Sequence, residues 1–220
     1  NKNALNPYNS GKLVKGYDFH QKIKDSILFT TEKRRAKRQW AHPILWNALV
    51  RASSKVQATY GTQYKLYVGD LSNQHGGKMS NHKSHQMGID ADIGFYSRKV
   101  PAPTRFYGAL VYNKNKGPTK VDARPQSVYG TINRSSTSYA MPKYFDLEMN
   151  ALYLDELFKD PKVNKIFLDT PLVMAMREWI NNNKPDDYST LQDAIKQRRL
   201  KTGGLPGHHN HYHIRMHIPV

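Results

Sequence analysis

The chain of 220 residues contains no cysteine. This absence excludes disulfide bonds, thiolate ligands for a metal ion and a cysteine nucleophile. The chain also lacks any apolar run near the ~18 residues that a membrane-spanning helix requires, so we expect no transmembrane segment. With 38% apolar residues it can still bury a sizeable core, and we expect it to fold.

Acidic residues are scarce. The chain has 34 lysines and arginines against 17 aspartates and glutamates, which gives a formal net charge of +17. Such an excess favours polyanionic partners, namely nucleic acid, an anionic membrane or an acidic cell-wall polymer. The sequence shows neither zinc-finger spacing nor an aromatic and basic motif of the RNA-binding kind. We therefore expect no nucleic-acid partner, while an anionic membrane and an acidic cell-wall polymer both stay open.

The first 16 residues, NKNALNPYNSGKLVKG, are polar and rich in turn-forming residues. They predict an N-terminal arm or irregular lead-in for residues 1–16, followed by a single domain over 17–220. The chain begins with Asn1 and carries no signal peptide. This pattern is consistent with a processed form from which an export signal has been removed.

The spacing of apolar residues predicts helices and strands in the remaining chain. Helices are expected at 43–56, from an Asp146 cap to about residue 158, from a Thr170–Pro171 cap to about residue 180, and from a Ser189–Gln192 capping box to about residue 200. Strands are expected at 65–68, 88–95 and 165–168, and in part of 105–112 within a long loop over 101–144. These elements predict an α+β fold with a small central antiparallel sheet, flanking helices and long loops.

The last thirteen residues, HHNHYHIRMHIPV, hold five of the ten histidines. His211, His213 and Arg215 alternate with Tyr212 and Ile214. A period of two predicts a β-strand with one polar and one apolar face. Imidazoles that share the polar face of a strand suggest one half of a metal site.

A second segment, NHKSHQMGIDADIGF at residues 81–95, is the candidate for the other half. Asp92 lies on the strand predicted there, and His85 lies in the loop before it. If this strand pairs with the C-terminal one, His85, Asp92 and His213 meet. Two imidazoles and one carboxylate form a typical catalytic zinc set, with a fourth position for water. Spacing alone leaves open the alternative that these side chains are merely solvated or hydrogen-bonded.

The two segments together resemble the penicillin-insensitive murein endopeptidases, whose pattern is S-H-x-x-G-x-D-x-D-I followed by H-x-x-H-x-H-[VI]-R. The pattern is matched by Ser84, His85, Gly88, Asp90, Asp92, Ile93, His208, His211, His213, Ile214 and Arg215. Weaker similarity in WAHPILWNALVRASSKV, LYVGDLS and FDLEMNALYLDELFKDPKVNKIFLDTPL extends over most of the chain from about residue 40. The family is grouped with lysostaphin, D-alanyl-D-alanine metallopeptidases and the hedgehog fold. The resemblance therefore implies a hedgehog/D-Ala-D-Ala-peptidase-like domain.

The resemblance also implies the metal and its ligands. By motif position, His85, Asp92 and His213 would hold Zn²⁺, and His82 matches a further histidine that can lie at the metal. His211 matches the histidine taken as the catalytic base.

Three more residues take roles around this site. His208 matches a second active-site histidine, which could donate a hydrogen bond to a developing oxyanion. Asp90 shares a strand face with Asp92 and could replace it as a ligand, but the family pattern makes Asp90 a partner of the ligands instead. Arg215 is expected to pair with a nearby carboxylate.

The resemblance thus implies a zinc-dependent endopeptidase that hydrolyses D-alanyl–diaminopimelyl cross-links between peptidoglycan stem peptides, in the periplasm or as a secreted protein. The alternatives are a D-alanyl-D-alanine carboxypeptidase, a non-catalytic zinc-bearing cell-wall-binding domain, and a basic nucleic-acid binder. The chain departs from the family in three respects. It lacks the cysteines of enterobacterial members, it has no histidine between His85 and His208 for a second metal, and residues 101–144 match poorly.

Overall fold

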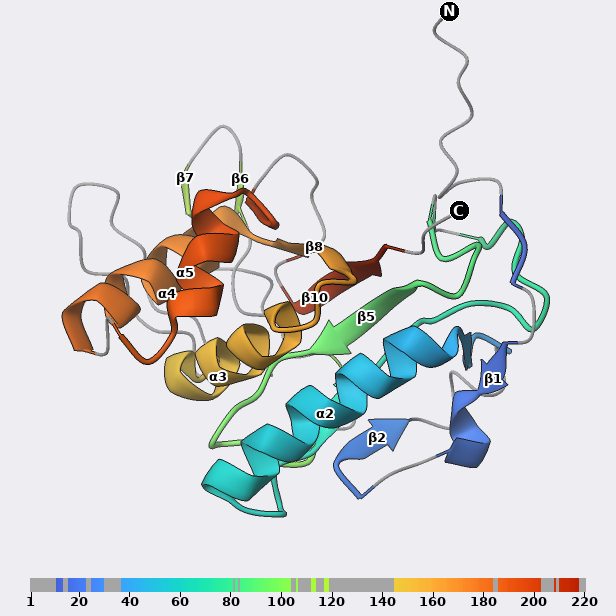
Figure 1. Cartoon of the computed structure of the whole chain (residues 1–220), viewed down its shortest axis with the longest axis horizontal. Helices are drawn as coiled ribbons and strands as arrows, with labels where there is room; N and C mark the ends of the chain where they lie inside the picture. The colour runs from blue at the N-terminus through green and yellow to red at the C-terminus, as the bar shows by residue number, and fades with distance from the viewer. Residues whose placement is uncertain are drawn as a thin grey trace, which may run out of the picture.

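A computed structural model describes residues 11–13, 16–22, 25–29, 37–80, 82, 84–103, 106, 112–113, 117–118, 145–183, 186–202, 208 and 210–217. Its framework is a six-stranded sheet (Figure 1) with the strand order β2-β4-β5-β10-β8-β9. These strands are β2 (Ile27–Phe29), β4 (Leu66–Val68), β5 (Asp90–Gly94), β10 (His211–Met216), β8 (Val163–Leu168) and β9 (Leu200–Thr202). Two small sheets pair β1 (Tyr17–Asp18) with β3 (Trp40–Ala41), and β6 (Tyr112–Asn113) with β7 (Gly117–Pro118).

The large sheet is mixed. Its four central strands, β4, β5, β10 and β8, pair antiparallel as predicted. Both edge strands instead run parallel to their neighbours, β2 to β4 and β9 to β8. A parallel pair needs a long crossover, and helices lie between the strands of each pair along the chain. The α+β class with a central antiparallel sheet is confirmed, and the parallel edge strands β2 and β9 extend that sheet on either side.

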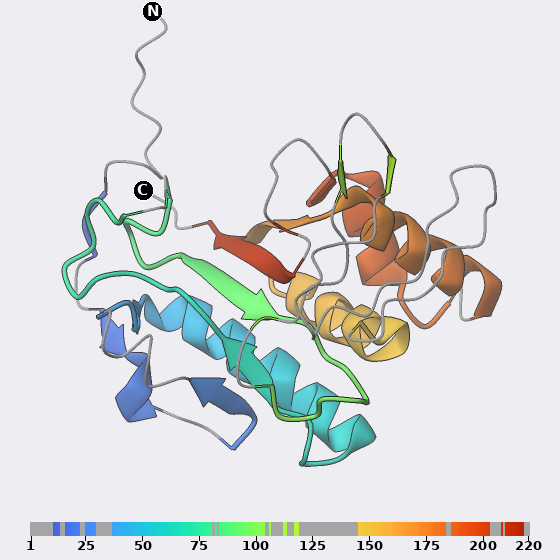
Figure 2. The same ribbon diagram turned by 180° about the vertical axis from the view of Figure 1, so that it is seen from behind.

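Two helices, α2 (Pro43–Tyr60) and α3 (Leu147–Phe158), cover one face of the sheet, as the two opposite views show (Figures 1 and 2). Alternate residues of β10 are fully buried on that face, among them Tyr212 and Ile214. The Tyr212 hydroxyl donates to Oδ1 of Asn150 on α3, at 2.7 Å. The core therefore lies between α2, α3 and the apolar face of β10, as the period of two predicted.

Two further helices, α4 (Thr170–Asn183) and α5 (Ser189–Lys196), lie at the β8–β9 end of the sheet, and a short 3-10 helix, η2 (Phe19–Lys22), lies near the start of the chain (Figure 1). Asp146 caps α3 as predicted, because its side chain accepts a hydrogen bond from the Met149 backbone at 3.0 Å. The predicted Thr170 cap is instead the first residue of α4. The His42 imidazole caps α2 by accepting from the Ile44 backbone.

The structure differs most from the sequence prediction in the segment from α5 to β9. α5 begins at Ser189 itself, and no side chain of its N-cap residue makes a capping bond. The carboxylate of Asp155 on α3 accepts from the Leu191 backbone at 2.8 Å and satisfies this helix start from outside the segment. Arg198 then takes a left-handed conformation, with φ of 57°, and ends the helical stretch. Leu200 consequently lies in β9 and not in a helix.

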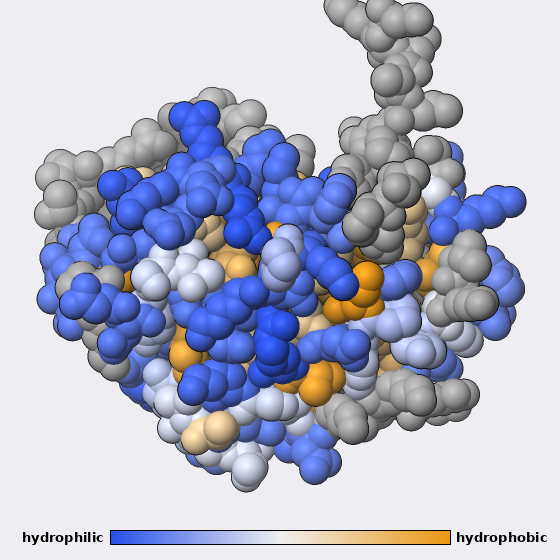
Figure 3. Space-filling model, viewed as in Figure 1, coloured by the Kyte–Doolittle hydropathy of each residue, from blue (hydrophilic) through white to orange (hydrophobic). Residues whose placement is uncertain are grey.

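The lead-in predicted for 1–16 is described only in part. Leu13 is buried, and its backbone N–H donates to the His75 carbonyl at 3.2 Å. Most of the strand expected at 105–112 lies outside the described residues. None of the helices in the described ranges combines the length and apolar character needed to cross a bilayer. Hydrophilic residues dominate the face seen in Figure 3, where apolar residues form small, separate areas.

Candidate metal centre

The two motif segments form neighbouring strands. β5 and β10 pair antiparallel, with His213 opposite Asp92 and Arg215 opposite Asp90. Since side chains alternate along a strand, these residues lie on the face opposite the α2–α3 core. The sequence analysis had only supposed this strand pairing, which brings residues more than 120 positions apart into contact.

The three histidines predicted to bind metal all lie around the carboxylate of the fourth predicted ligand, Asp92. Ligand-capable atoms of His82, His85 and Asp92 lie within 4.8 Å of one another, so these residues could hold a metal ion. Nδ1 of His213 is 3.0 Å from Oδ1 of Asp92, and Nε2 of His85 is 3.3 Å from the same oxygen. Three imidazoles therefore surround a single buried carboxylate.

His85 has the burial and the ring orientation expected of a metal ligand. Its side chain is 0% exposed, and Nδ1 lies 2.8 Å from the Leu71 carbonyl oxygen. Nε2 is buried and has no hydrogen-bond partner within the described part of the chain. An unsatisfied buried nitrogen costs free energy, and a bond from Nδ1 to a backbone carbonyl is the usual way to orient a ligating histidine. This donor set fits a metal ion.

Backbone geometry sets the position of this loop. His85 has φ of 65°, an uncommon left-handed conformation for a residue with a side chain. Gly88 has φ of +67°, and a Cβ there would approach the Leu13 side chain to 2.8 Å. The Gly88 carbonyl accepts from the His42 backbone at 2.7 Å and ties the loop to the start of α2. The motif glycine therefore serves backbone conformation and close packing.

His82 is held by a chain of polar contacts that the sequence did not indicate. Its Nε2 is 2.9 Å from Oδ2 of Asp70, and Nδ1 is 3.9 Å from Oδ2 of Asp92. Arg38 donates to the same Asp70 oxygen at 3.0 Å and to the Ser80 hydroxyl at 2.7 Å. Asp70 thus orients the ring through Nε2, which leaves Nδ1 directed toward the candidate site.

His213 lies between two carboxylates. Nε2 is 2.8 Å from Oδ1 of Asp90, and Arg215 donates through Nε to the same oxygen at 2.7 Å. Burial lowers the pKa of His213, but hydrogen bonds to Asp90 and Asp92 outweigh this effect and raise the pKa to about 9. Burial raises the pKa of the Asp92 carboxyl, but the neighbouring His85 and His213 hold it well below its usual range.

His211 and His208 lie beside this group, each against a phenylalanine ring. His211 stacks on Phe106 with centroids 4.9 Å apart, and its Nε2 is 3.6 Å from Oδ1 of Asp92. Nδ1 of His211 is 2.5 Å from the Asn210 side-chain oxygen. His208 stacks on Phe167, with centroids 5.8 Å apart, and lies 5.3 Å from the His211 ring.

The structure therefore brings every predicted site residue into one region. We call His82, His85, His208, His211 and His213 the histidine cluster. Sequence analysis missed the residues that hold it, namely Arg38, Asp70, Phe106, Phe167 and the Leu71 carbonyl. Asp70 and Leu71 belong to the segment LYVGDLS, whose similarity to the family was the available signal.

An α+β domain whose paired motif strands bury histidines around a carboxylate defines a candidate metal-dependent enzyme. The chain matches the family model Peptidase_M74, described as penicillin-insensitive murein endopeptidase, over residues 20–220. It belongs to that family. The penicillin-insensitive murein endopeptidase of Haemophilus influenzae is 25% identical over 184 residues, which cover 83% of this chain and 53% of that protein. The chain thus spans about half the length of the curated relative it matches.

Proposed function

We propose that the chain is a zinc-dependent peptidoglycan endopeptidase that hydrolyses D-alanyl–diaminopimelyl cross-links outside the cytoplasm, in the periplasm or as a secreted protein. The observation that carries this proposal is the buried, unsatisfied Nε2 of His85 directed at the Asp92 carboxylate. Family membership supports the substrate class, and the all-nitrogen-and-oxygen donor set supports zinc.

The ligands in this proposal are His85 through Nε2, Asp92 through its carboxylate and His213 through Nδ1. His213 is assigned Nδ1 because Asp90 occupies its Nε2. His82 could add Nδ1, since its other nitrogen contacts Asp70. A zinc ion bound there polarises the scissile carbonyl and lowers the pKa of water at the site to ~7.

His211 is proposed as the base. Its Nε2 faces Asp92 while Asn210 holds Nδ1, so Nε2 is the nitrogen that can take a proton from the attacking water and return it to the leaving amine. The stacked Phe106 ring restricts the rotation of this imidazole. His208, 5.3 Å from His211 between ring centroids, is proposed to donate a hydrogen bond to the carbonyl oxygen as negative charge develops there.

Asp90 and Arg215 hold the scaffold of the site. Asp90 accepts from Arg215 and contacts His213, so it fixes the orientation of the proposed ligand without contacting the substrate. Such partners of a ligand typically change metal affinity or activity by ~10- to 100-fold when mutated.

The net charge of +17 supports an anionic cell-wall polymer as the surface on which the protein works. Binding through exposed lysines and arginines should fall as salt rises, because exposed charges are screened over ~10 Å at 0.1 M. Removal of zinc should leave most of this binding intact, since the surface cations do not depend on the metal.

The decisive experiment is solubilisation of purified sacculi with and without a chelator, followed by mass spectrometry of the products. The proposal expects zinc-dependent release of uncross-linked muropeptides. Release of free D-alanine alone would indicate a carboxypeptidase. If zinc-loaded protein binds sacculi without cleaving them, the chain is a non-catalytic cell-wall-binding domain.

Metal analysis of variants tests the ligand assignment separately. His85→Ala, Asp92→Ala and His213→Ala should each lose most of the single zinc expected in the native protein. His75→Ala, which removes an exposed histidine outside the cluster, is the matched control and should keep it. Full zinc occupancy in all three ligand variants would refute the assignment.

A further inference from the structure

A second concave site lies on the surface between α4, α5 and β9. It is a hollow of about 460 Å³, within the size range of sites that bind small ligands. We call it the cationic hollow. It is lined by Thr170, Val173, Met174, Arg177, Ile195, Arg198, Leu200 and Lys201.

The rim of the cationic hollow carries three positive charges. Arg177, Arg198 and Lys201 are exposed, and none of them lies within 4.0 Å of a carboxylate in the described part of the chain. Arg51 on α2, by contrast, pairs with Glu156 at 3.2 Å. Among the described residues that line the hollow, three are cationic and none is acidic, so this lining attracts an anion.

Its floor is apolar. Val173 and Leu200 are buried beneath the hollow, while Met174 is 49% exposed although its side chain is large and hydrophobic. An apolar floor with a cationic rim suits a ligand that combines carboxylates with short aliphatic groups. Guanidinium groups can bind carboxylates through two parallel hydrogen bonds, which adds geometric selectivity.

The hollow is linked to the histidine cluster by one aromatic ring. Nζ of Lys201 lies 6.0 Å from the centroid of Phe167, and the same ring stacks on His208. The strand register agrees, because Phe167 on β8 is opposite Lys201 on one side and His213 on the other. A peptide that extends from the reacting bond across Phe167 would therefore reach Lys201 first.

We propose that the cationic hollow binds a carboxylate-bearing part of the stem peptide, away from the bond that is cut. The identity of the ligand rests on the proposed function, since peptidoglycan stems carry free carboxylates and alanine methyl groups. Arg177 and Arg198 bind the carboxylates, and Met174 with Val173 contacts the methyl groups. The hollow thus determines substrate affinity, while the histidine cluster performs the chemistry.

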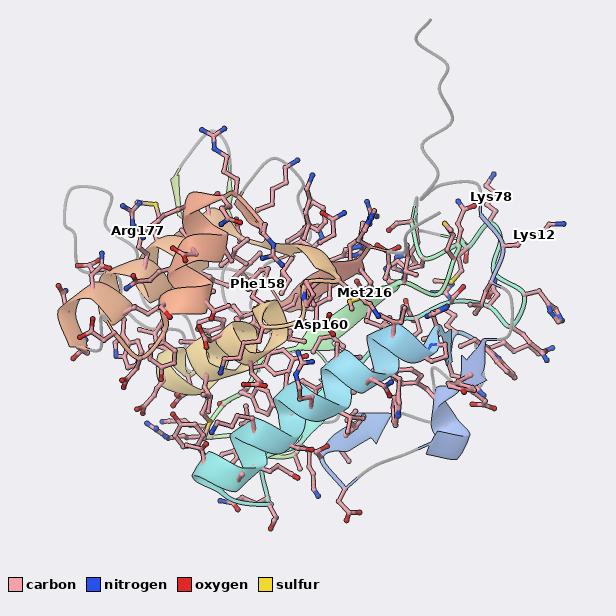
Figure 4. The ribbon with its side chains drawn as sticks, viewed as in Figure 1. Lys12, Lys78, Phe158, Asp160, Arg177 and Met216 are labelled. Atoms are coloured by element: carbon pink, nitrogen blue, oxygen red, sulfur yellow. The ribbon has the colours of Figure 1, made fainter. Side chains whose placement is uncertain are left out.

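The test compares two triple variants with the same change in charge. Arg177→Ala/Arg198→Ala/Lys201→Ala, the rim triple variant, removes the three positive charges from the rim of the cationic hollow. Lys12→Ala/Lys55→Ala/Lys78→Ala removes three exposed charges elsewhere; Figure 4 shows Lys12 and Lys78 at the opposite end of the molecule from Arg177. Arg177→Gln/Lys201→Gln, which removes two charges but keeps polar side chains, guards against loss of fold, as judged by circular dichroism.

The first readout is the Kd of a soluble, uncross-linked stem peptide, measured by titration calorimetry in the presence of a chelator. The rim triple variant should bind about tenfold more weakly than the native protein, as expected for the loss of several exposed ion pairs. The control triple variant should bind within about twofold, and a stem peptide with amidated carboxylates should not distinguish the proteins. Equal Kd values for the two triple variants would overturn the proposal.

The second readout is cleavage of a cross-linked muropeptide, for which the rim variant should raise KM about tenfold and leave kcat within about twofold. If the rim triple variant binds the stem peptide more weakly but the native protein cleaves no muropeptide, the proposed function is wrong and the binding site stands. If the rim triple variant cleaves with a native KM, the binding site is wrong and the proposed function stands. Loss of binding to vesicles with anionic phospholipid, with unchanged Kd for the stem peptide, would assign the hollow to a membrane surface and overturn the proposal.

Discussion

The two faces of the β5–β10 pair differ in composition and in how their polar atoms are hydrogen-bonded. On the face toward α2 and α3, Tyr212 and Ile214 are fully buried, and the Tyr212 hydroxyl has a partner in Asn150. On the other face, Asp92 is 4% exposed, yet Nε2 of His85 beside it makes no hydrogen bond within the described residues. Burial stabilises the first face, whereas the second needs a cation to be satisfied.

The polar face also concentrates charge that the apolar face lacks. Burial raises the pKa of Asp90, but His213, His85 and Arg215 outweigh it and hold this pKa below its ordinary value. Both carboxylates therefore stay ionised, next to a histidine whose pKa is raised to about 9. A divalent cation can balance the two negative charges and displace the proton from the histidine. The comparison predicts that the two faces respond differently to mutation.

The largest expected effect is on turnover. His211→Ala should lower the rate of muropeptide cleavage by ~10²- to 10⁴-fold, because a general base is lost. The variant should keep its zinc, since the proposed ligands are other residues, and its stability should change little. Cleavage rate and metal content are measured on the same sample. A native rate would show that His211 has been given the wrong role.

The opposite face should respond in stability and not in chemistry. Ile214→Ala removes a fully buried side chain one residue from a proposed ligand, and should lower the free energy of unfolding by about 2–5 kcal/mol. Zinc content and kcat of the folded protein should stay close to native. Denaturant unfolding measures the change, with His217→Ala, at an exposed position just past β10, as a control expected within about 0.5 kcal/mol. Equal stability of the two variants would contradict the division between the faces.

The two faces also differ in how far the sequence predicted them. The alternation in β10 predicted both faces, because a period of two depends only on the strand itself. The partners of the polar face were missed, since Asp70 lies 12 residues from His82 and 22 from Asp92 and contacts them only after β4, β5 and the loop between them have folded. The same limit explains α5, where a carboxylate from α3 replaced the expected Ser189 capping box. Sequence patterns within a segment predicted which helices and strands form. Contacts between residues far apart in the chain determined where α5 begins and which residues hold the histidine cluster.

Asp70 is one of the residues that the sequence analysis missed, and its role can be tested. Asp70→Asn keeps the size of the side chain but removes the charge that orients His82, and should weaken zinc binding by about 10- to 100-fold. Asp18→Asn makes the same chemical change at a carboxylate that accepts from the Gln39 amide and from the His20 backbone, outside the histidine cluster, and should leave the affinity unchanged. Competition with a chromophoric chelator measures both. If Asp70→Asn binds zinc like the control, His82 is not held for a metal by Asp70.

The effect expected for a single pH unit is smaller, about tenfold, and comes from the proton on His213. Burial lowers the pKa of this residue, but Asp90 and Asp92 raise it to about 9, so the metal-free site holds a proton at neutral pH. Zinc must displace that proton, and raising the pH toward 9 weakens the competition. Zinc affinity should therefore rise about tenfold per pH unit from pH 7 and level off above pH 9. Chelator competition from pH 7 to 9.5 measures the slope, which Asp90→Asn should flatten by removing one acceptor of that proton. An affinity that stays constant between pH 7 and 8.5 in the native protein would mean that His213 carries no proton for the metal to displace.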